Sequence, residues 1–516
     1  MANESTKAAG AGDPPKSGEL PTIAYKPSPG YWQRTLRDFA RNRLAVVSVV
    51  MVFLVATIGV FCPLIASQRP LAIKMVFSDD YEEAYFVALD LAERIAGDRS
   101  TDLALDRRLL DRVFLRMRPH LASAHHERFD ELRNALSVGA GIRSGTASLS
   151  LQEAIAAFAD EMDLPAVQLI PVTRFPAVRA LSQNEVMFIS FYIFTILLFV
   201  FRGRVPGGGW CWIGALALCT AVATTVWTTV FPVIQDATPY RRVINSDNFR
   251  QSPDWWVITA PIPFGENENI TAESRQPPTW LLPDDQRVEG QNWHWLGTDT
   301  NGRDVLSRMV YGARISMLIG LVAVSIYVTI GTILGALAGY YAGWMDLLLS
   351  RIIEIVICLP VLFLILSVQA FLRPNILNIM ILLGLVWWTG PARLARGEFL
   401  RIGNMEYVAA VRAIGGSDLR IIFMHVLPNA IGPILVSISF GMAGSILVES
   451  TLSFLGFGVP PPTASWGDLL NNGRGDIQTL WWLTFFPGLA IFLTLTCFNL
   501  IGDGLRDALD PRRKNG

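Results

Sequence analysis

Charged residues are scarce in this sequence of 516 residues, making up 17% of the positions, whereas hydrophobic residues make up 51%. With a mean hydropathy of +0.37, the chain is too apolar for an ordinary soluble protein of this length. Basic and acidic residues nearly balance, at 43 and 44, so net charge gives no support for nucleic-acid binding. The composition therefore predicts a protein of the lipid bilayer.

Cysteine and histidine number five each, and their spacing fits no metal site. All the cysteines lie in apolar stretches, and none forms a Cys-x-x-Cys pair, which argues against a disulfide framework or a zinc motif. On a helix, the neighbouring side chains of His125 and His126 point about 100° apart and do not readily hold one ion. We expect no metal and no cofactor bound by this chain.

A Gly-Lys pair is missing from the whole sequence, although a phosphate-binding loop requires one. No Ser-His-Asp arrangement suggests chemistry of another kind. The sequence therefore predicts a protein that is not an enzyme and that does not hydrolyse ATP itself.

Long uncharged stretches are abundant, and each is a candidate membrane helix. The stretch 186–201 is short for a full crossing, but Glu185 and Arg202 can extend it by snorkelling. A re-entrant segment is the alternative interpretation of this stretch. The eight stretches are 44–66, 186–201, 205–235, 315–345, 355–372, 374–392, 421–448 and 477–502.

The arginines of the short connections indicate the orientation. If the amino terminus is cytoplasmic and the helices alternate, the inside connections are 202–209, 346–351, 393–420 and the tail from Asp503. These connections hold the arginines of the short loops, as the positive-inside rule requires. We therefore expect an eight-helix protein with both termini in the cytoplasm.

A charged segment between the first two apolar stretches, about 78–162, has apolar residues at helical spacing. Ser150 and Glu153 fit a capping box that opens a short helix before Pro165. This spacing predicts a helical module outside the membrane, and the alternation of the membrane helices puts that module outside the cytoplasm. The apolar residues are Leu105, Leu109, Leu110, Val113, Phe114 and Met117.

The loop before the seventh apolar stretch has the pattern of two short helices joined by a glycine turn. Residues 406–418 read Glu-Tyr-Val-Ala-Ala-Val-Arg-Ala-Ile-Gly-Gly-Ser-Asp, and a second amphipathic stretch ends at Leu427-Pro428. The small side chains of Ala409 and Ala410 allow another protein surface to approach closely, and the glycines permit a sharp reversal. An ordinary basic linker is the alternative interpretation.

This loop resembles the EAA loop of ABC importer permeases, whose pattern is Glu-Ala-Ala, three residues, Gly, nine residues, Ile, one residue and Leu-Pro. The spacing matches throughout, but Ala409, Val411 and His425 replace the family's Glu, second Ala and Ile. In that family the helix sits in a groove of the ATPase subunit. The resemblance therefore assigns ATPase coupling to Glu406, Tyr407, Ala409, Ala410, Arg412, Gly415, Gly416, Ser417, Leu427 and Pro428.

Further motifs resemble the oligopeptide, dipeptide and nickel branch of these permeases. They are the run 296–308, Leu-Gly-Thr-Asp-Thr-Asn-Gly-Arg-Asp-Val-Leu-Ser-Arg, the run 447–456, the pair Pro460-Pro461 and the triplet 465–467. The likeness covers about 31–66 and 293–511, whereas the region 67–292 is much longer than the branch's plan. The function of that region is not implied by the resemblance.

The implied fold class is an all-α polytopic membrane protein. It has the six-helix core of a type I ABC importer, two extra membrane helices and a helical extramembrane insertion. The expected segments are a disordered cytoplasmic tail at 1–30, the first membrane helix within 31–66, an extracytoplasmic insertion at 67–185, two added membrane helices at 186–235, an extracytoplasmic loop at 236–296, the permease core at 297–505 with its coupling loop at 393–428, and a tail at 506–516.

The resemblance also implies the partners and the location. ABC ATPase subunits would bind ATP and magnesium, a second homologous permease would complete the pathway, and an extracytoplasmic binding protein would deliver the solute. The location implied is the bacterial inner membrane. Peptide is the favoured solute, while nickel, glycosides and peptide-like antibiotics stay open.

Charged residues near the predicted membrane helices have two interpretations each. Glu449 suits a pore or gate, or an interfacial or structural pairing. In the signature loop, Asp299, Gly302, Arg303 and Asp304 suit a capped turn, and direct solute contact is the alternative. Arg351 and Glu354 stand three residues apart and suit an intrahelical ion pair.

Two other classes of protein stay open at this point. A gradient-driven transporter or channel ought to show buried charges along several helices or interrupted helices in repeated halves, and neither pattern is evident. A membrane-anchored sensor or scaffold would explain the insertion but not the coupling loop.

Overall fold

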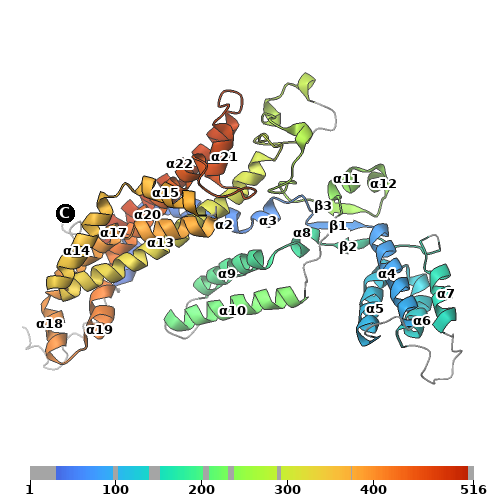
Figure 1. Ribbon diagram of the computed structural model, residues 1–516, viewed down its shortest axis with the longest axis horizontal. Coiled ribbons are helices and arrows are strands. Elements are labelled where there is room, and N and C mark those ends of the chain that lie inside the picture. Colours follow the sequence, from blue (N-terminus) through green and yellow to red (C-terminus); the bar gives the residue numbers. More distant parts are fainter. Residues whose placement is uncertain are drawn as a thin grey trace, which may run out of the picture.

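The computed structural model describes residues 31–96, 103–138, 151–164, 166–201, 209–230, 238–287, 292–372 and 375–509. A bundle of long helices lies at one end of the molecule and a module of shorter helices at the other, with a small sheet between them (Figure 1). The predicted tail 1–30 and most of the connection 202–209 fall outside the described residues.

The bundle is built from the amino-terminal helices and from nearly the whole second half of the chain. Its elements are α1 (Tyr31–Arg41), α2 (Arg43–Val60), α3 (Cys62–Ile65), α13 (Val305–Tyr341), α14 (Gly343–Cys358), α15 (Val361–Phe371), α16 (Ile376–Val386), α17 (Thr389–Gly403), α18 (Glu406–Ala413), α19 (Asp418–Arg420), the π-helix η5 (Ile421–Val426), α20 (Leu427–Phe454), α21 (Trp466–Gly473) and α22 (Trp482–Leu509).

Membrane-spanning candidates occur at seven of the eight predicted stretches. Within the described ranges, seven helices are long and apolar enough to cross a bilayer. The helices α14 and α15 pass the same test together, but they are bent by 78° at the break between them. Seven of the predicted stretches thus contain a candidate membrane helix, whereas 355–372 covers the end of α14 and the whole of α15 in this bent pair.

Three glycines allow α13 and α17 to pack with their backbones in contact. Gly331, Gly335 and Gly339 lie four residues apart, on one face of α13. A Cβ atom on Gly335 would lie 2.3 Å from the carbonyl oxygen of Ala392, and the other two positions are nearly as tight. Small residues at this spacing permit close helix packing without a side chain between the helices.

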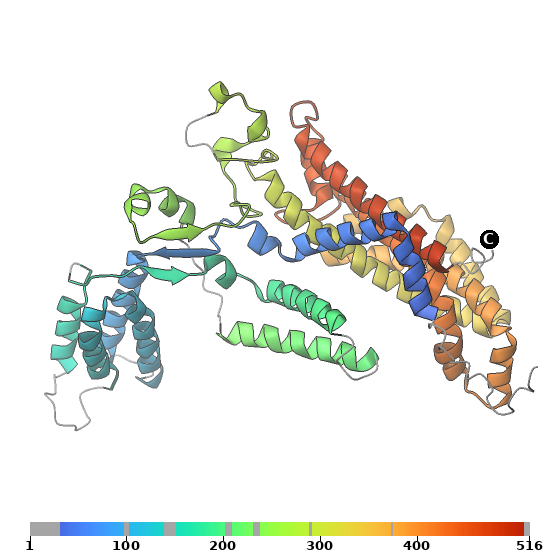
Figure 2. The same cartoon turned by 180° about the vertical axis from the view of Figure 1, so that it is seen from behind.

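The amino-terminal helices pack against the carboxyl end of α22. A Cβ atom on Gly504 would meet Ala45 of α2 at 2.4 Å and Phe39 of α1 at 3.3 Å. Figure 2 shows this corner at the same end of the bundle as α18 and α19, away from the insertion. The two ends of the described chain and the predicted coupling loop therefore share one side.

The insertion contains the helical module that the apolar spacing predicts. Its helices are α4 (Ser78–Ala96), α5 (Leu103–Met117), α6 (Ser123–Val138) and α7 (Leu151–Glu161), with the short η1 (Arg118–His120). They enclose a core of their own, in which Phe114 packs edge-on against Phe129 and Phe158. The predicted capping residue Ser150 lies outside the described residues.

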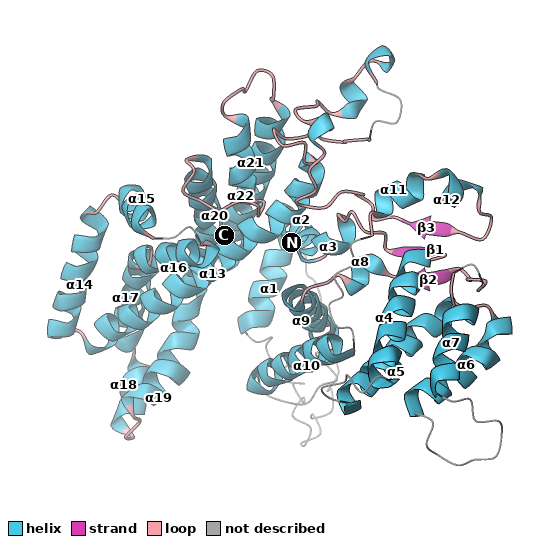
Figure 3. Ribbon diagram, turned by 45° about the vertical axis from the view of Figure 1, so that its right-hand side comes forward, coloured by secondary structure: helices cyan, strands magenta, loops and turns pink. Residues whose placement is uncertain are grey.

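A three-stranded antiparallel sheet ties the insertion together, and the sequence does not predict it. The strands are β1 (Ala72–Met75), β2 (Val172–Arg174) and β3 (Trp256–Ile258), in the order β2-β1-β3. Ile73 pairs with Arg174 on one side and with Val257 on the other. Figure 3 shows this sheet between the module and the bundle. It brings together three segments that are distant in the sequence.

The two extra membrane helices form a hairpin beside the bundle. They are α9 (Gln183–Val200) and α10 (Gly209–Val230), and α9 begins with a capping box between Ser182 and Glu185. The hydroxyl of Tyr192 lies 2.5 Å from that of Thr57 on α2. The remaining elements are α8 (Pro176–Arg179), α11 (Tyr240–Asn245), α12 (Asp247–Gln251), η2 (Thr271–Glu273), η3 (Thr279–Leu281) and η4 (Asp284–Gln286).

Candidate functional site

The predicted coupling helix is α18, a short helix at the end of the bundle. Val408 is its one buried residue, packed with Phe399 of α17 and Ile421 of η5. Ala409 and Ala410 are exposed, as are Glu406, Tyr407 and Arg412. The helix is therefore attached to the bundle by one side and presents a small-residue surface on another.

The turn after α18 depends on its two glycines. Gly415 has φ of +84°, a backbone conformation that L side chains rarely adopt. A Cβ atom on Gly416 would lie 2.9 Å from the carbonyl oxygen of Val411. Ser417 then occupies the N-cap position of α19. The chain reverses here as the glycine turn predicts.

The long helix α13 holds this turn in place. The hydroxyl of Tyr340 donates to the carboxylate of Asp418 at 2.6 Å, and the guanidinium of Arg412 lies 5.5 Å from the centre of the Tyr340 ring. Arg412 before the turn and Asp418 after it thus both contact Tyr340 of α13. These contacts join the coupling loop to α13.

The helix α20 is joined to α18 through the carbonyl of His425, which stands where the EAA pattern has Ile. Tyr407 donates to this carbonyl at 3.3 Å and Asn429 at 2.8 Å. The carbonyl belongs to the π-helix η5, which runs directly into α20 at Leu427 and Pro428. Having His425 in place of Ile does not remove these two hydrogen bonds, because they use the backbone carbonyl of His425 and not its side chain.

The signature loop is a capped turn in front of α13. Asp299 accepts from the backbone N–H of Arg303 at 3.0 Å and from its guanidinium at 2.7 Å. Gly302 has φ of +75°, and its missing Cβ would lie 2.1 Å from the carbonyl oxygen of Ile270. Asp304 is the N-cap of α13, accepting from the N–H of Ser307 at 2.7 Å. This geometry agrees with the structural interpretation of the loop, and solute contact stays a prediction.

Behind the turn, His294 is enclosed by two carboxylates. Its Nδ1 lies 2.8 Å from Asp304 and its Nε2 lies 3.0 Å from Glu273. Burial alone would lower the pKa of His294, but the two hydrogen bonds outweigh burial and raise this pKa. The pKa of Glu273 is lowered, because the bonds from His294 and Asn292 outweigh its own burial. The side chain of His294 links the loop at Glu273 to the cap of α13.

Arg308 connects the same region to α21. Its side chain is fully buried, and it donates to Asp468 at 2.9 Å, while Asp299 lies 3.8 Å away. Its Nη1 donates to the backbone carbonyl oxygens of Glu266, at 3.3 Å, and of Pro462, at 3.4 Å. The charges are paired within the protein, as buried charges require.

Glu449 is fully buried in α20 and is surrounded by hydroxyl groups. Ser453 donates to its carboxylate at 2.8 Å, Ser316 at 3.2 Å and Ser450 at 3.4 Å. These donors come from α13 and α20, so the carboxylate stabilises the contact between those helices. Both interpretations of Glu449 stay predictions, although this arrangement favours structural pairing.

One smaller prediction can also be placed. Arg351 and Glu354 form the intrahelical ion pair expected at this spacing, at 2.6 Å. Across the described parts of the chain, no group of three or more His, Cys, Asp or Glu side chains is arranged to hold a metal ion.

Comparison with known proteins supports the resemblance to ABC importer permeases. Residues 331–515 match the family described as the binding-protein-dependent transport system inner membrane component, and residues 30–82 match the N-terminal TM domain of oligopeptide transport permease C. The oligopeptide transport system permease protein OppC of Haemophilus influenzae is 44% identical over 222 residues, covering 43% of this chain and 71% of that protein. The chain belongs to this permease family.

Two further relatives are also named as permeases of transport systems. The di/tripeptide permease DppC of Pseudomonas aeruginosa is 40% identical, over 50% of this chain and 82% of that protein. The peptidoglycan transport permease YejE of Agrobacterium fabrum is 39% identical, over 50% and 71%. A solved inward-facing structure of the MetNI methionine ABC transporter has a TM-score of 0.31 at 16% identity, covering 39% of this chain and 97% of that one.

The permease is thus an inner-membrane, multi-pass subunit of an ABC importer. The coupling loop and Glu449 lie within the main matched region, whereas most of the insertion lies outside both matched regions. Sequence reasoning assigned no role to Tyr340, His294, Glu273, Arg308 or Asp468. The partners named above are 9 to 160 residues away, so no local pattern reports them. The one local signal was the position of Arg308, which is the last residue of the signature run 296–308.

Proposed function

We propose that this permease imports peptides or similar small solutes together with a second homologous permease, two ABC ATPase subunits and an extracytoplasmic solute-binding protein. ATP and magnesium bind to the ATPase subunits. Both termini and the coupling loop face the cytoplasm, and the insertion faces the other side. The names of the relatives support the solute class, and the position of the insertion opposite α18 supports the orientation.

The observation that carries this proposal is the attachment of α18. The helix exposes Ala409 and Ala410, while Val408 anchors it in a core shared with α17 and η5. The same loop exposes large apolar side chains, and exposed apolar patches of this kind mark protein contacts. They are Ile414, Leu419, Phe423 and Met424, each more than 60% exposed.

The proposed mechanism is alternating access. Closure of the ATPase subunits moves α18, and the contacts of Tyr340 and His425 pass the movement to α13 and α20. Because Glu449 joins these two helices, they respond as a pair. Solute passes between this permease and its partner permease. In this scheme the signature loop holds the outer end of α13.

The proposal is tested by recovering partners of the tagged protein from membranes in mild detergent. We expect the wild type to retain ATPase subunits and a second permease. Ala410→Arg places a long charged side chain on the exposed surface of α18, and we expect it to lose the ATPase subunits by about tenfold or more while keeping the second permease.

The matched control is Ala124→Arg, at an exposed alanine of α6 in the insertion. It should retain every partner. A wild-type protein that recovers no ATPase would instead favour a gradient-driven transporter. Equal recovery with Ala410→Arg would move the coupling role away from α18.

A further inference from the structure

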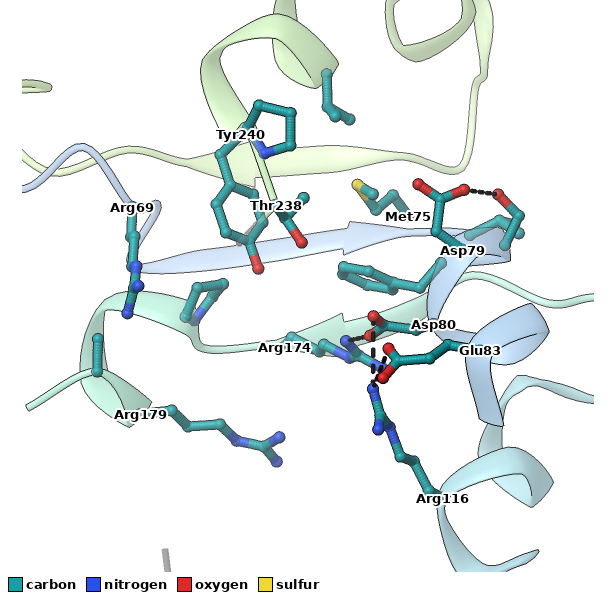
Figure 4. A pocket seen from close by; sticks show the side chains of 17 residues that line it. Arg69, Met75, Asp79, Asp80, Glu83, Arg116, Arg174, Arg179, Thr238 and Tyr240 are labelled. Carbon is teal, nitrogen blue, oxygen red and sulfur yellow. Dashed lines mark hydrogen bonds and ion pairs between the residues drawn. The ribbon is translucent and has the colours of Figure 1, made fainter. Parts of the chain in front are cut away.

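The insertion encloses a cavity of about 620 Å³ that the proposed mechanism does not use. Its walls come from the sheet and from α4, α5, α8 and α11, segments that are far apart in the sequence (Figure 4). Binding sites for small molecules typically have volumes of roughly 300–1,000 Å³. The cavity is therefore large enough for a molecule of a few amino-acid residues.

Two groups of charged side chains lie at opposite ends of this cavity. Figure 4 shows the guanidinium groups of Arg69 and Arg179 at one end, and at the other the carboxylate of Asp79 beside the paired side chains of Asp80, Glu83, Arg116 and Arg174. The hydroxyl groups of Tyr240 and Thr238 point into the space between the two ends. A cavity of this kind is complementary to a molecule with opposite charges at its two ends.

One wall of the cavity is fixed by charges that neutralise one another. Arg174 forms an ion pair with Asp80 and lies 4.0 Å from the centre of the Phe77 ring. Arg116 lies 3.5 Å from Glu83 and 3.7 Å from Asp80. Since these groups are satisfied within the protein, they shape the cavity and leave the recognition of a ligand to others.

Two charged groups in the cavity lack an opposite charge. Among the described residues, Arg179 forms no ion pair, and its side chain is exposed. Asp79 is exposed too, and within the same ranges its carboxylate accepts only from the hydroxyl of Ser78, at 3.2 Å. Guanidinium groups bind carboxylates in paired hydrogen bonds, and carboxylates bind ammonium groups.

We propose that this cavity is a binding site for short zwitterionic peptides, with the peptide carboxylate at Arg179 and its ammonium group at Asp79. The apolar side chains of Met75 and Val243 line the space between and accept small side chains. The peptide as ligand class rests on the proposed function, whereas the site itself rests on the geometry of the cavity. The insertion thus gives the permease a solute site of its own, in addition to that of the binding protein.

The test is calorimetric titration of the full-length protein in nanodiscs with trialanine. We expect saturable binding that Arg179→Gln and Asp79→Asn each weaken about tenfold, the loss of one charge-assisted contact. N-acetyl-trialanine and trialanine amide each lack one terminal charge and should also bind about tenfold more weakly. Arg179→Lys keeps the charge and should restore part of the affinity.

The matched controls are exposed residues of the same module that do not line the cavity. Arg112→Gln and Glu82→Gln should leave trialanine binding unchanged. Failure of trialanine to bind the wild type, or equal binding by the two cavity variants, would overturn the site. If acetylation of the amino group had no effect, the zwitterion assignment would fall and a simple anion site would replace it.

Uptake of labelled trialanine by the assembled importer in proteoliposomes separates this inference from the proposed function. Uptake without any binding to the cavity would remove the site and leave the importer. Binding that depends on Arg179 and Asp79, with no ATP-driven uptake, would leave the site and remove the importer assignment.

Discussion

At the scale of single residues, the pairing of His294 with two carboxylates makes the stability of the signature loop depend on pH. Asp304 and Glu273 raise the pKa of His294, so the folded protein holds this proton more tightly than the unfolded chain. The stabilisation is fully present below the unfolded pKa of about 6.5 and is lost as pH rises through the folded pKa.

We therefore expect the free energy of unfolding of the purified protein to decrease as pH increases above about 6.5. The total decrease is about 1.4 kcal/mol for each pH unit by which the folded pKa of His294 exceeds its unfolded pKa, and it is measured as a lower melting temperature. His120 does not contribute in this window, because burial and Arg174 lower its pKa to about 4. The control is His294→Gln, whose melting temperature should vary less with pH over the same range. Equal slopes for the two proteins would contradict the assignment.

Single residues also show the limits of the sequence. The alanines, glycines and Leu427-Pro428 of the coupling loop could be selected because a continuous motif contains them. His294, Tyr340 and Arg308 could not, because their roles arise from partners brought close by folding. A buried ion pair between residues 308 and 468 leaves no periodic signal in either segment.

At the scale of secondary structure, the glycine face between α13 and α17 should tolerate no added carbon. Gly335→Ala places a methyl group 2.3 Å from the carbonyl oxygen of Ala392, so the helices must separate. We expect a loss of about 1–3 kcal/mol, the usual cost of overpacking, measured as a lower melting temperature in detergent.

Gly397→Ala on α17 is the matched control, because the added carbon would have no atom within 4 Å apart from its chain neighbours and the backbone of its own helix. Alanine should there stabilise the helix by up to about 1 kcal/mol. A Gly335→Ala protein as stable as the wild type would show that the two helices pack less closely than described.

The elements also differ in how well a sequence can predict them. The seven candidate membrane helices were predictable, because a membrane helix needs a long uncharged run that is visible locally. The sheet was not, since its strands have four, three and three residues and lie about a hundred residues apart. Such short strands show no reliable alternation of polar and apolar residues.

At the scale of the whole molecule, the helical module of the insertion has a core that takes nothing from the membrane bundle. Every buried residue of that core lies between Tyr81 and Val167. We therefore expect a fragment of residues 77–171 to fold alone and to unfold cooperatively on heating, as followed by circular dichroism.

Within that fragment, Phe114→Ala should cost about 3–5 kcal/mol, because Phe114 is fully buried. Leu115→Ala, at a neighbouring residue that is 58% exposed, should change stability by less than about 0.5 kcal/mol. A fragment without a cooperative transition would mean that the module needs the sheet and the bundle in order to fold.

The helix α13 joins the two sides of this architecture. It runs without a proline from the cap at Asp304 to Tyr340 beside the coupling loop, over 37 residues. At 1.5 Å per residue it is about 55 Å long, so a tilt of about 5° around one end moves the other end by about 5 Å. The helix can therefore act as a lever, by which a small rotation at the predicted coupling loop becomes a displacement of several ångströms at the other end of α13.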